Sequence, residues 1–302
     1  MKRNHFKEEW DKIEDVKTYP HYLRNIIIID ADEFASKVFS ASEQEAKSLV
    51  NSIYSGDAYI LKNALSPEYV ESLKEKVFNW SKTVEEKYFE MRDGCPDYHT
   101  INKISKAPAG GYISLEHSYV FFRHNNSIDI FNPFERYWEA IKVLSGNSKY
   151  AYKNNTPSSG IIDRITLLQY PIGFGKITKH YDSSKSQKLL LGNIMTQIGE
   201  DYDYGENGFY LVDKNEKNIY IENLVQKGDF VCAYPTMYHG VPTIKKRGAS
   251  EEVDWNSTSG RWYLQCYSAE SHEVKNREYT VAIKDDAGHG PIANYIGSHP
   301  DE

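Results

Sequence analysis

The sequence predicts a mainly β protein with flanking helices, built around a sandwich or barrel of short strands. Between residues 161 and 268, apolar residues recur with a period of two in short stretches separated by Gly- and Asp-containing turns. Before residue 150, apolar residues recur at helical spacing instead. With 302 residues, 40% of them apolar and 26% charged, the chain is long enough to bury a sizeable core.

Residues 1–150 are expected to form a helix-rich part that packs on the barrel. The β-branched run at 26–30 predicts a buried strand. Ser40 and Glu43 have the spacing of a capping box, which predicts a helix from there to about residue 54. After a short strand at 59–62, Ser66-Pro67-Glu68 supplies an N-cap, a first-turn proline and an acid. This combination predicts a helix from residue 67 to about residue 91.

Between residues 95 and 160 we expect loops around two further elements. The polar stretch 95–111 predicts a loop, 119–122 a strand, and 133–144 a helix with Trp138 and Ile141 facing inward. The segment 151–160 is rich in Asn, Ser, Thr and Pro and predicts a connecting loop rather than a linker between domains.

The β core is expected at 160–270, followed by a C-terminal extension at 271–302, so that residues 1–302 form a single domain. Its strands are expected at 161–170, 189–198, 208–213, 217–222, 229–234, 238–244 and 261–268.

Composition excludes several classes of partner. A net charge of −7 argues against a nucleic-acid-binding surface, and the short basic run Lys245-Lys246-Arg247 is typical of a solvated loop tip. Three scattered cysteines are too few for a disulfide framework. No apolar run has the length of a membrane span or the character of a secretory signal. We therefore expect a cytoplasmic protein that acts on a small molecule.

Three side chains form a candidate metal site. His180 and Asp182 are two residues apart, so on an extended strand they point to the same side. His239 is the third candidate. Two imidazoles and one carboxylate on one face of an ion, with the other face open, are typical of non-haem iron(II) oxygenases. A surface pair and a core histidine are the structural alternative, since histidine is common in interior networks.

The surroundings of these residues are also specific. The run 169–175 leads toward His180, a Gly-Asp turn at 228–229 precedes the strand pair with His239, Val241-Pro242 follows it, and Arg261 opens another strand. Here the sequence resembles the iron(II)/2-oxoglutarate-dependent dioxygenases over residues 160–270, with weaker similarity at 59–73. The phytanoyl-CoA hydroxylase-like and prolyl hydroxylase-like branches both remain open.

The resemblance implies a double-stranded β-helix, a jelly-roll, cupin-like barrel with the metal near one mouth. His180, Asp182 and His239 would hold Fe(II), with 2-oxoglutarate as cosubstrate and O2 as oxidant. Arg261 would bind the distal carboxylate of 2-oxoglutarate, assisted by Tyr263 on the same strand face. The guanidinium fork suits this task because it pairs with a carboxylate through two hydrogen bonds and stays charged when buried.

One spacing departs from the family pattern. Arg261 lies 22 residues after His239, farther than in many members, whereas Arg247 lies eight residues after it. We favour Arg261 because it opens an apolar strand, while Arg247 belongs to the basic loop tip. The segment 248–258 is then an insertion, either part of a lid or a solvated loop.

Other polar residues are weaker candidates. Tyr170 and Asn193 are expected on strands that line the barrel, where they would contact the 2-oxo acid or serve packing. Four further polar residues could approach a polar substrate, namely Arg164, His117, Arg123 and Lys176. Individually, such residues are more often held in structural salt bridges.

The resemblance implies an oxygenase that couples oxidative decarboxylation of 2-oxoglutarate to oxidation of a C–H bond in a small-molecule metabolite, with release of succinate and CO2. Hydroxylation is the favoured reaction, and desaturation, epoxidation and cyclisation are the alternatives. Asp182 argues against halogenation, because the related halogenases carry a small residue there. Two alternatives remain: a cupin-like metal-binding protein without turnover, and a zinc-dependent hydrolase or isomerase. The absence of an obvious glutamate base beside either histidine counts against the latter.

Overall fold

Two facing sheets form the centre of the computed structural model, which describes residues 4–14, 19–103, 112–125, 127–185, 187–249 and 252–283. One sheet has the order β10 (Phe230–Ala233), β7 (Leu190–Ile194), β12 (Arg261–Glu270), β5 (Ile161–Tyr170). The other has the order β6 (Lys176–Tyr181), β11 (His239–Val241), β8 (Tyr210–Val212), β9 (Asn218–Tyr220). Because the chain crosses repeatedly from one sheet to the other, this is a double-stranded β-helix, and the predicted fold class is confirmed.

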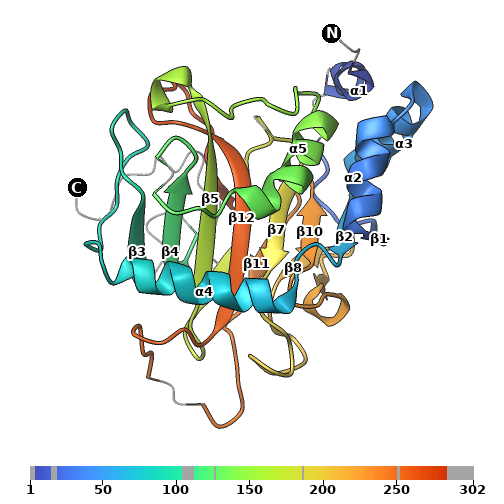
Figure 1. The fold of residues 1–302 in the computed structure, drawn as a ribbon. Coiled ribbons are helices and arrows are strands. Elements are labelled where there is room, and N and C mark those ends of the chain that lie inside the picture. The colour runs from blue at the N-terminus through green and yellow to red at the C-terminus, as the bar shows by residue number, and fades with distance from the viewer. Residues whose placement is uncertain are drawn as a thin grey trace.

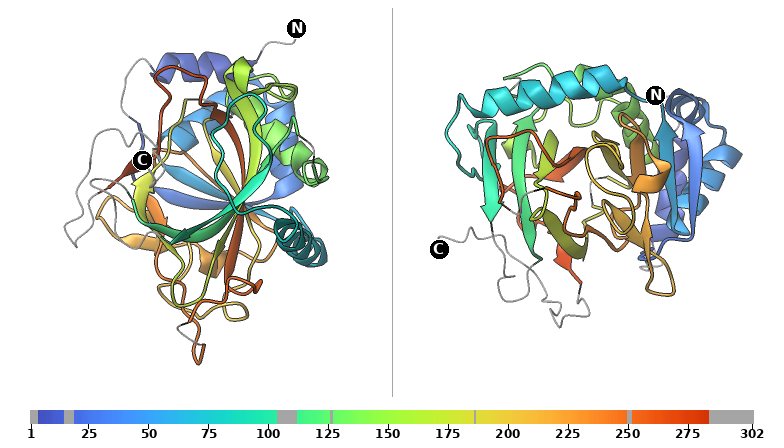
Figure 2. Two further views of the ribbon diagram at one scale, coloured as in Figure 1. Left: turned by 90° about the vertical axis from the view of Figure 1, so that its left-hand side faces the viewer. Right: turned by 90° about the horizontal axis from the view of Figure 1, so that it is seen from below.

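Further strands extend and close this core. β4 (Ser114–Phe122) pairs with both β5 and β6 and so joins the two sheets at one side. Figure 2 shows the resulting curled sheet from its end. The other added strands are β3 (Tyr98–Lys103) on β4, β2 (Asp57–Lys62) on β10, β1 (Asn25–Asp30) on β2, and β13 (Val281–Ala282) on β6.

Two of these strands differ from the sequence prediction. The run 26–30 does form β1, but as an edge strand rather than a buried one, and Ile28 is 55% exposed. β3 lies inside the stretch that we expected to be a loop. Its residues are largely polar, and it becomes a strand because it pairs with β4 along its whole length.

Helices cover the outer side of the sheet that contains β5 and β12. Figure 1 shows α4 running across the lower part of this sheet, α5 above it, and α2 and α3 beside β1 and β2. Within the described ranges, no helix is both long and apolar enough to cross a membrane. The helices are α1 (His5–Glu14), α2 (Ala31–Ser40), α3 (Glu43–Tyr54), α4 (Pro67–Ser81) and α5 (Glu135–Leu144), with 3-10 turns η1 (Asn132–Phe134), η2 (Pro157–Ser159) and η3 (Glu222–Leu224).

Helix ends show where the sequence prediction was imprecise. The capping box of α3 is formed by Ser42 and Glu45, because Ser40 is the last residue of α2, a helix that we did not predict. The N-cap of α4 at Ser66 is confirmed, but the helix ends at Ser81 and not near residue 91. Beyond it the chain is extended, and Glu86 pairs with His99 of β3.

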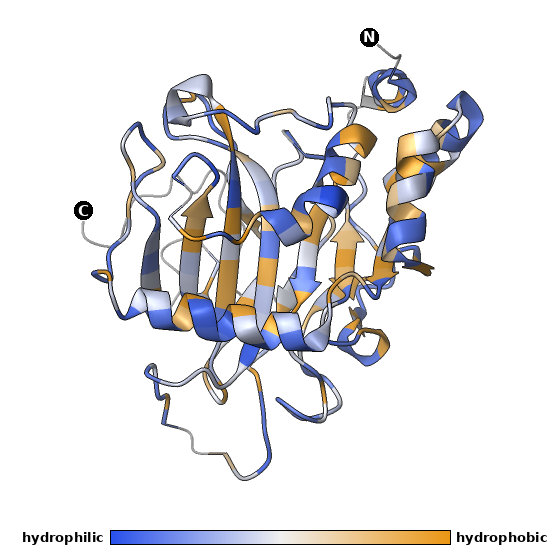
Figure 3. Cartoon of the chain, in the orientation of Figure 1, coloured by the Kyte–Doolittle hydropathy of each residue, from blue (hydrophilic) through white to orange (hydrophobic). Residues whose placement is uncertain are grey.

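The two faces of the sheet that contains β5 and β12 differ in polarity. Alternate residues of these strands, such as Leu167 and Leu264, are fully buried against the helices in the main core. Figure 3 shows the apolar residues alternating along the strands in this region. The intervening residues are more polar and face the inside of the barrel, where they line a cavity of about 380 Å³. The fold therefore places its apolar core outside the barrel and leaves the inside for a polar site.

Candidate metal centre and active-site cavity

The structure brings His180, Asp182 and His239 together on one wall of this cavity. One donor atom from each lies within 4.8 Å of the others. His180 on β6 and His239 on β11 are direct partners in the antiparallel register, and their ring centroids are 4.2 Å apart. Asp182 follows the end of β6, where its backbone N–H donates to Pro235 O at 2.8 Å. Two strands and the turn before β11 thus assemble the three donors.

Backbone hydrogen bonds fix the tautomer of both histidines. His180 Nδ1 donates to Thr178 O at 2.7 Å, and His239 Nδ1 donates to Met237 O at 2.8 Å. In both rings Nδ1 is therefore engaged by a backbone carbonyl, and Nε2 is the nitrogen left for a ligand. His239 Nε2 lies 3.6 Å from Asp182 Oδ2. Histidines that bind metals are typically held by such a bond from the other ring nitrogen.

The protonation states also suit a cation. Burial and, to a smaller extent, the neighbouring His239 lower the pKa of His180 to about 4, so the imidazole is neutral at pH 7. Burial raises the pKa of Asp182, but the two histidines and Thr280 outweigh it, and the pKa lies well below its ordinary value. Metal ligands must be deprotonated, and these two already are at neutral pH.

Arg261 begins β12 and lies in the wall of the same cavity. Its side chain is 1% exposed, between the rings of Tyr170 at 5.6 Å and Tyr263 at 5.5 Å. Gly260, just before β12, lets the chain approach the end of β5 closely, because a Cβ there would lie 2.3 Å from the backbone oxygen of Tyr170. Although burial alone lowers the pKa of Arg261, the adjacent Glu222 raises it above the ordinary value, so the guanidinium stays charged.

Glu222 is a partner of Arg261 that the sequence analysis missed. Its Oε1 accepts from Arg261 Nε at 2.7 Å and lies 2.5 Å from Nη2. Oε1 also accepts from the Phe209 N–H, and Oε2 accepts from the Tyr202 hydroxyl, each at 2.9 Å. Because Glu222 occupies only the Nε/Nη2 edge and no other described residue bonds to this guanidinium, the Nη1/Nη2 edge is available for a second carboxylate.

Tyr170 and Tyr263 both lie in the cavity wall, next to Arg261. Tyr263 crosses over Gly192, where a Cβ would lie 1.9 Å from its hydroxyl oxygen. Tyr170 is fully buried, and its hydroxyl interacts with Glu116, another acid that the sequence analysis did not single out. Burial raises the pKa of Glu116.

Asn193 and Arg247 lie away from this cavity. Asn193 is fully buried on the opposite face of β7, and its amide donates to Gly228 O at 2.9 Å and Asp229 O at 3.2 Å. The period of two explains this, because its neighbours Gly192 and Ile194 take the inner face. Arg247 is exposed on its loop. Of the segment 248–258, residues 250 and 251 are outside the described part.

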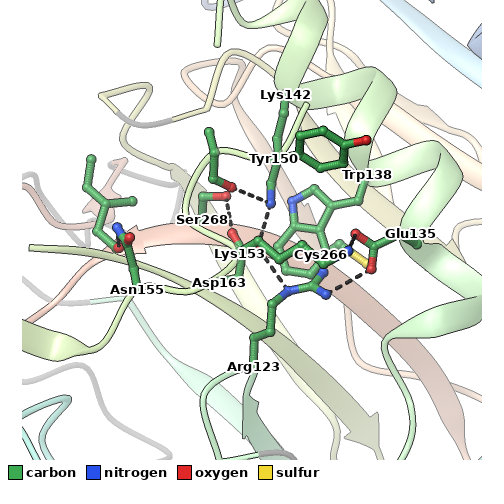
Figure 4. A network of polar contacts seen from close by, with 12 residues as sticks. Arg123, Glu135, Trp138, Lys142, Tyr150, Lys153, Asn155, Asp163, Cys266 and Ser268 are labelled. Carbon is green, nitrogen blue, oxygen red and sulfur yellow. Dashed lines mark hydrogen bonds and ion pairs between the residues drawn. The ribbon is translucent and has the colours of Figure 1, made fainter. Parts of the chain in front are cut away.

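Among the weaker candidates, only Arg164 lines the cavity. Arg123 pairs with Asp163 at 3.1 Å and Glu135 at 2.8 Å, in the buried network between β4, β5 and α5 that Figure 4 shows. His117 lies 2.9 Å from His99 in a buried cluster, and burial lowers its pKa to about 3. Lys176 is absent from the cavity lining. Arg123 and His117 thus bond to other buried residues and have a structural role, as is usual for these residue types.

The C-terminal extension contributes to the site as well. Val281 and Ala282 of β13 pair with Tyr181 and His180 of β6. This register brings the Thr280 hydroxyl to Asp182 Oδ1 at 2.5 Å. A strand of two residues leaves no periodic signal in the sequence, which is why this contact was not foreseen.

Comparisons with known proteins give structural similarities at low sequence identity. No family model and no curated protein matches the chain. A full-length Neurospora crassa protein in complex with alpha-KG is 13% identical, with 82% of this chain and 86% of that chain covered and a TM-score of 0.46. A Caulobacter crescentus protein described as of the 2OG-Fe(II) oxygenase family is 11% identical, with 81% and 87% covered and a TM-score of 0.47. JOX2 in complex with 2OG, Fe and JA is 11% identical, with 91% and 82% covered and a TM-score of 0.45.

Proposed function

We propose that this protein is a non-haem Fe(II)- and 2-oxoglutarate-dependent oxygenase that oxidises a C–H bond of a small-molecule metabolite. The observation that supports this most is the occurrence of two features in one cavity. One is the open-faced His180, Asp182, His239 cluster, and the other is the buried, charged Arg261 with a free edge.

The donor set fits ferrous iron. Two imidazoles whose Nδ1 atoms are held by backbone carbonyls and one ionised carboxylate occupy one side of the cavity, which leaves the other side open for ligands. Thr280 donates to the carboxylate oxygen Oδ1, while Oδ2 is the oxygen nearest His239. Thr280 would therefore orient Asp182 without occupying the oxygen nearest the second histidine.

Arg261 fits the distal carboxylate of 2-oxoglutarate. Its free edge offers two parallel N–H donors, and Glu222 holds the other edge so that the guanidinium plane is fixed. The rings of Tyr170 and Tyr263 flank the cation and keep water from it. The cosubstrate would thus be held between a positive group at one end and the metal at the other.

Fe(II), 2-oxoglutarate and O2, when bound together, supply an oxidant able to attack an unactivated C–H bond, with succinate and CO2 as the other products. The protein's own residues position the ligands and shield them. The walls around His180 and His239 include the rings of Tyr112 and Phe209, at 5.4 and 5.6 Å from the two imidazoles. Such a site limits side reactions with water.

Succinate release tests this proposal and searches for the substrate at the same time. We expect Fe(II) and 2-oxoglutarate to give succinate in air, and one class within a metabolite panel to accelerate it. Arg261→Gln removes a charge-assisted carboxylate contact and should weaken 2-oxoglutarate binding by about ten- to a hundredfold. Arg247→Gln is the matched control and should behave as wild type.

Two results would contradict this proposal, the first its assignment of Arg261 and the second the oxygenase itself. Succinate release that Arg247→Gln abolishes and Arg261→Gln spares would assign the cosubstrate to the loop arginine. No succinate with any panel member, together with hydrolysis of one of them by the zinc-loaded protein, would favour the metallohydrolase, for which Glu116 in the same cavity is a candidate carboxyl group.

A further inference from the structure

Two arginines face the cavity without an acidic partner among the described residues. Arg164, on β5, has its Nη1 3.7 Å from Met91 Sδ and its guanidinium carbon 5.9 Å from the Tyr267 ring. Its Nε is buried and has no hydrogen-bond partner in the described ranges. No ion pair among the described residues includes Arg164. A buried guanidinium nitrogen that lacks an acceptor is costly, and such groups usually indicate an absent ligand or water.

Arg277 reaches the same place from the segment between β12 and β13. Its Nη1 lies 2.7 Å from His272 Nε2, and its guanidinium carbon is 4.9 Å from the Tyr279 ring. In the part of the chain that the structure describes, it also has no ion pair. Met91, which Arg164 contacts, donates its backbone N–H to His272, which Arg277 contacts, so the two arginines line the same part of the cavity. Burial lowers the pKa of Arg277, and the positive charge of Arg164 also lowers it.

The acids around this arginine pair are engaged elsewhere. Glu270 pairs with Lys185 at 2.9 Å, Glu278 accepts from the Ser183 hydroxyl at 2.6 Å, and Glu90 pairs with Arg92 at 2.5 Å. Among the described residues, then, no carboxylate forms an ion pair with either cation, and Glu90 interacts with Arg277 only at longer range. Like charges brought together in a partly desolvated wall destabilise the protein unless an anion joins them.

The arginine pair lies at the other end of the barrel wall from Arg261. Arg164 is the register partner of Tyr267, six residues along β12 from Arg261, which is about 20 Å at ~3.4 Å per residue. The Tyr267 hydroxyl donates to Ser183 O at 2.8 Å, one residue after Asp182. The metal ligands therefore lie between a cation suited to the cosubstrate and a pair of cations with no assigned ligand.

We propose that Arg164 and Arg277 bind an anionic group of the substrate, a carboxylate or a phosphate. This rests on the proposed function, since it assigns the opposite end of the cavity to 2-oxoglutarate. Guanidinium groups form paired hydrogen bonds with both kinds of anion. Tyr88, Tyr98 and Tyr279 line the cavity around them. The anion fixes one end of the substrate and so selects which C–H bond reaches the metal.

Fluorine NMR of small probes tests this site without turnover. The probes are 4-fluorobenzoate, 4-fluorophenyl phosphate and, as the neutral control, 4-fluorobenzamide. Each is titrated into the full chain without added metal, and again with zinc(II) and 2-oxoglutarate present. We expect at least one anion to bind ten times more tightly than the amide or better. Preference for the phosphate or for the benzoate then distinguishes the two anion classes.

Variants locate the binding. Arg164→Gln and Arg277→Gln should each weaken anion binding about tenfold, since each removes a charge-assisted contact. Arg164→Lys keeps the charge and should retain part of the affinity, which separates anion binding from a folding defect. Arg247→Gln, on the exposed loop, should leave binding unchanged.

Several outcomes would overturn the anion site. They are equal affinities for the benzoate and the benzamide, unchanged anion binding in the Arg164→Gln/Arg277→Gln double variant, and anion binding that depends on Arg261 alone. The proposed oxygenase has a separate test, which is the absorption spectrum of the wild-type protein with Fe(II) and 2-oxoglutarate. If the wild-type protein gives no charge-transfer band in that spectrum but still binds the anions, the proposed function is overturned and the arginine site is not.

Discussion

Arg261 and Glu222 form a buried pair in which each residue is 2% exposed or less. The carboxylate makes it possible to keep a guanidinium in this wall when no cosubstrate is present. Removing one partner of a buried ion pair typically costs about 3–5 kcal/mol, because the other charge is left uncompensated. A second carboxylate, from 2-oxoglutarate, would take over part of that compensation.

This gives a prediction for Glu222→Gln. The variant should lose about 3–5 kcal/mol of unfolding free energy without ligands. Since bound 2-oxoglutarate then supplies the missing negative charge, it should stabilise the variant more than it stabilises wild type. Urea unfolding of both proteins, with and without 2-oxoglutarate, measures the two differences.

Glu206→Gln is the control, because Glu206 is exposed. Equal stabilisation of wild type and Glu222→Gln by 2-oxoglutarate would mean that the cosubstrate carboxylate does not reach Arg261.

At the scale of elements, β13 and the segment before it connect the two ends of the site. This stretch carries Arg277 at the arginine pair and Thr280 at Asp182, and its last residues pair with β6. The C-terminal extension is therefore part of the cavity wall. One short segment can influence both the metal and the substrate anion.

Thr280→Val tests the contact with the metal ligand. The substitution keeps the shape of the side chain and removes the hydroxyl that donates to Asp182. Loss of such a supporting hydrogen bond usually lowers metal affinity about 10- to 100-fold. Competition titration with a chromophoric chelator, using zinc(II) or iron(II), gives the affinity, and Thr280→Ser should retain it. A wild-type metal affinity in Thr280→Val would show that this hydroxyl has no part in holding the ligand.

At the scale of the whole molecule, local patterns predicted the architecture and the local part of the site. The period of two in 161–268 follows from one face of each strand packing against the core, so it is visible in the sequence. The spacing of His180 and Asp182 is similarly local. Element ends were less certain: Ser40 with Glu43 and Ser42 with Glu45 both have capping-box spacing, and only the unforeseen α2 selects the second pair.

The residues that could not be foreseen owe their place to contacts distant in sequence. Glu222 meets Arg261 across 39 residues, and Thr280 meets Asp182 across 98. Arg164 could be named as a candidate, but its lack of an acidic partner among the described residues depends on where every acid of the fold lies. Arg123 looked equivalent in the sequence, yet it forms ion pairs with Asp163 and Glu135 in the buried network. Sequence spacing carries no information about such pairings.

The central claim is that His180, Asp182 and His239 hold iron to which 2-oxoglutarate binds directly. Anaerobic addition of Fe(II) and then 2-oxoglutarate to the metal-free protein tests it, with absorption spectra recorded after each step. We predict a visible metal-to-ligand charge-transfer band that requires both additions and is lost in His239→Ala. A folded protein that gives no such band, or a band that survives the loss of His239, would contradict the account.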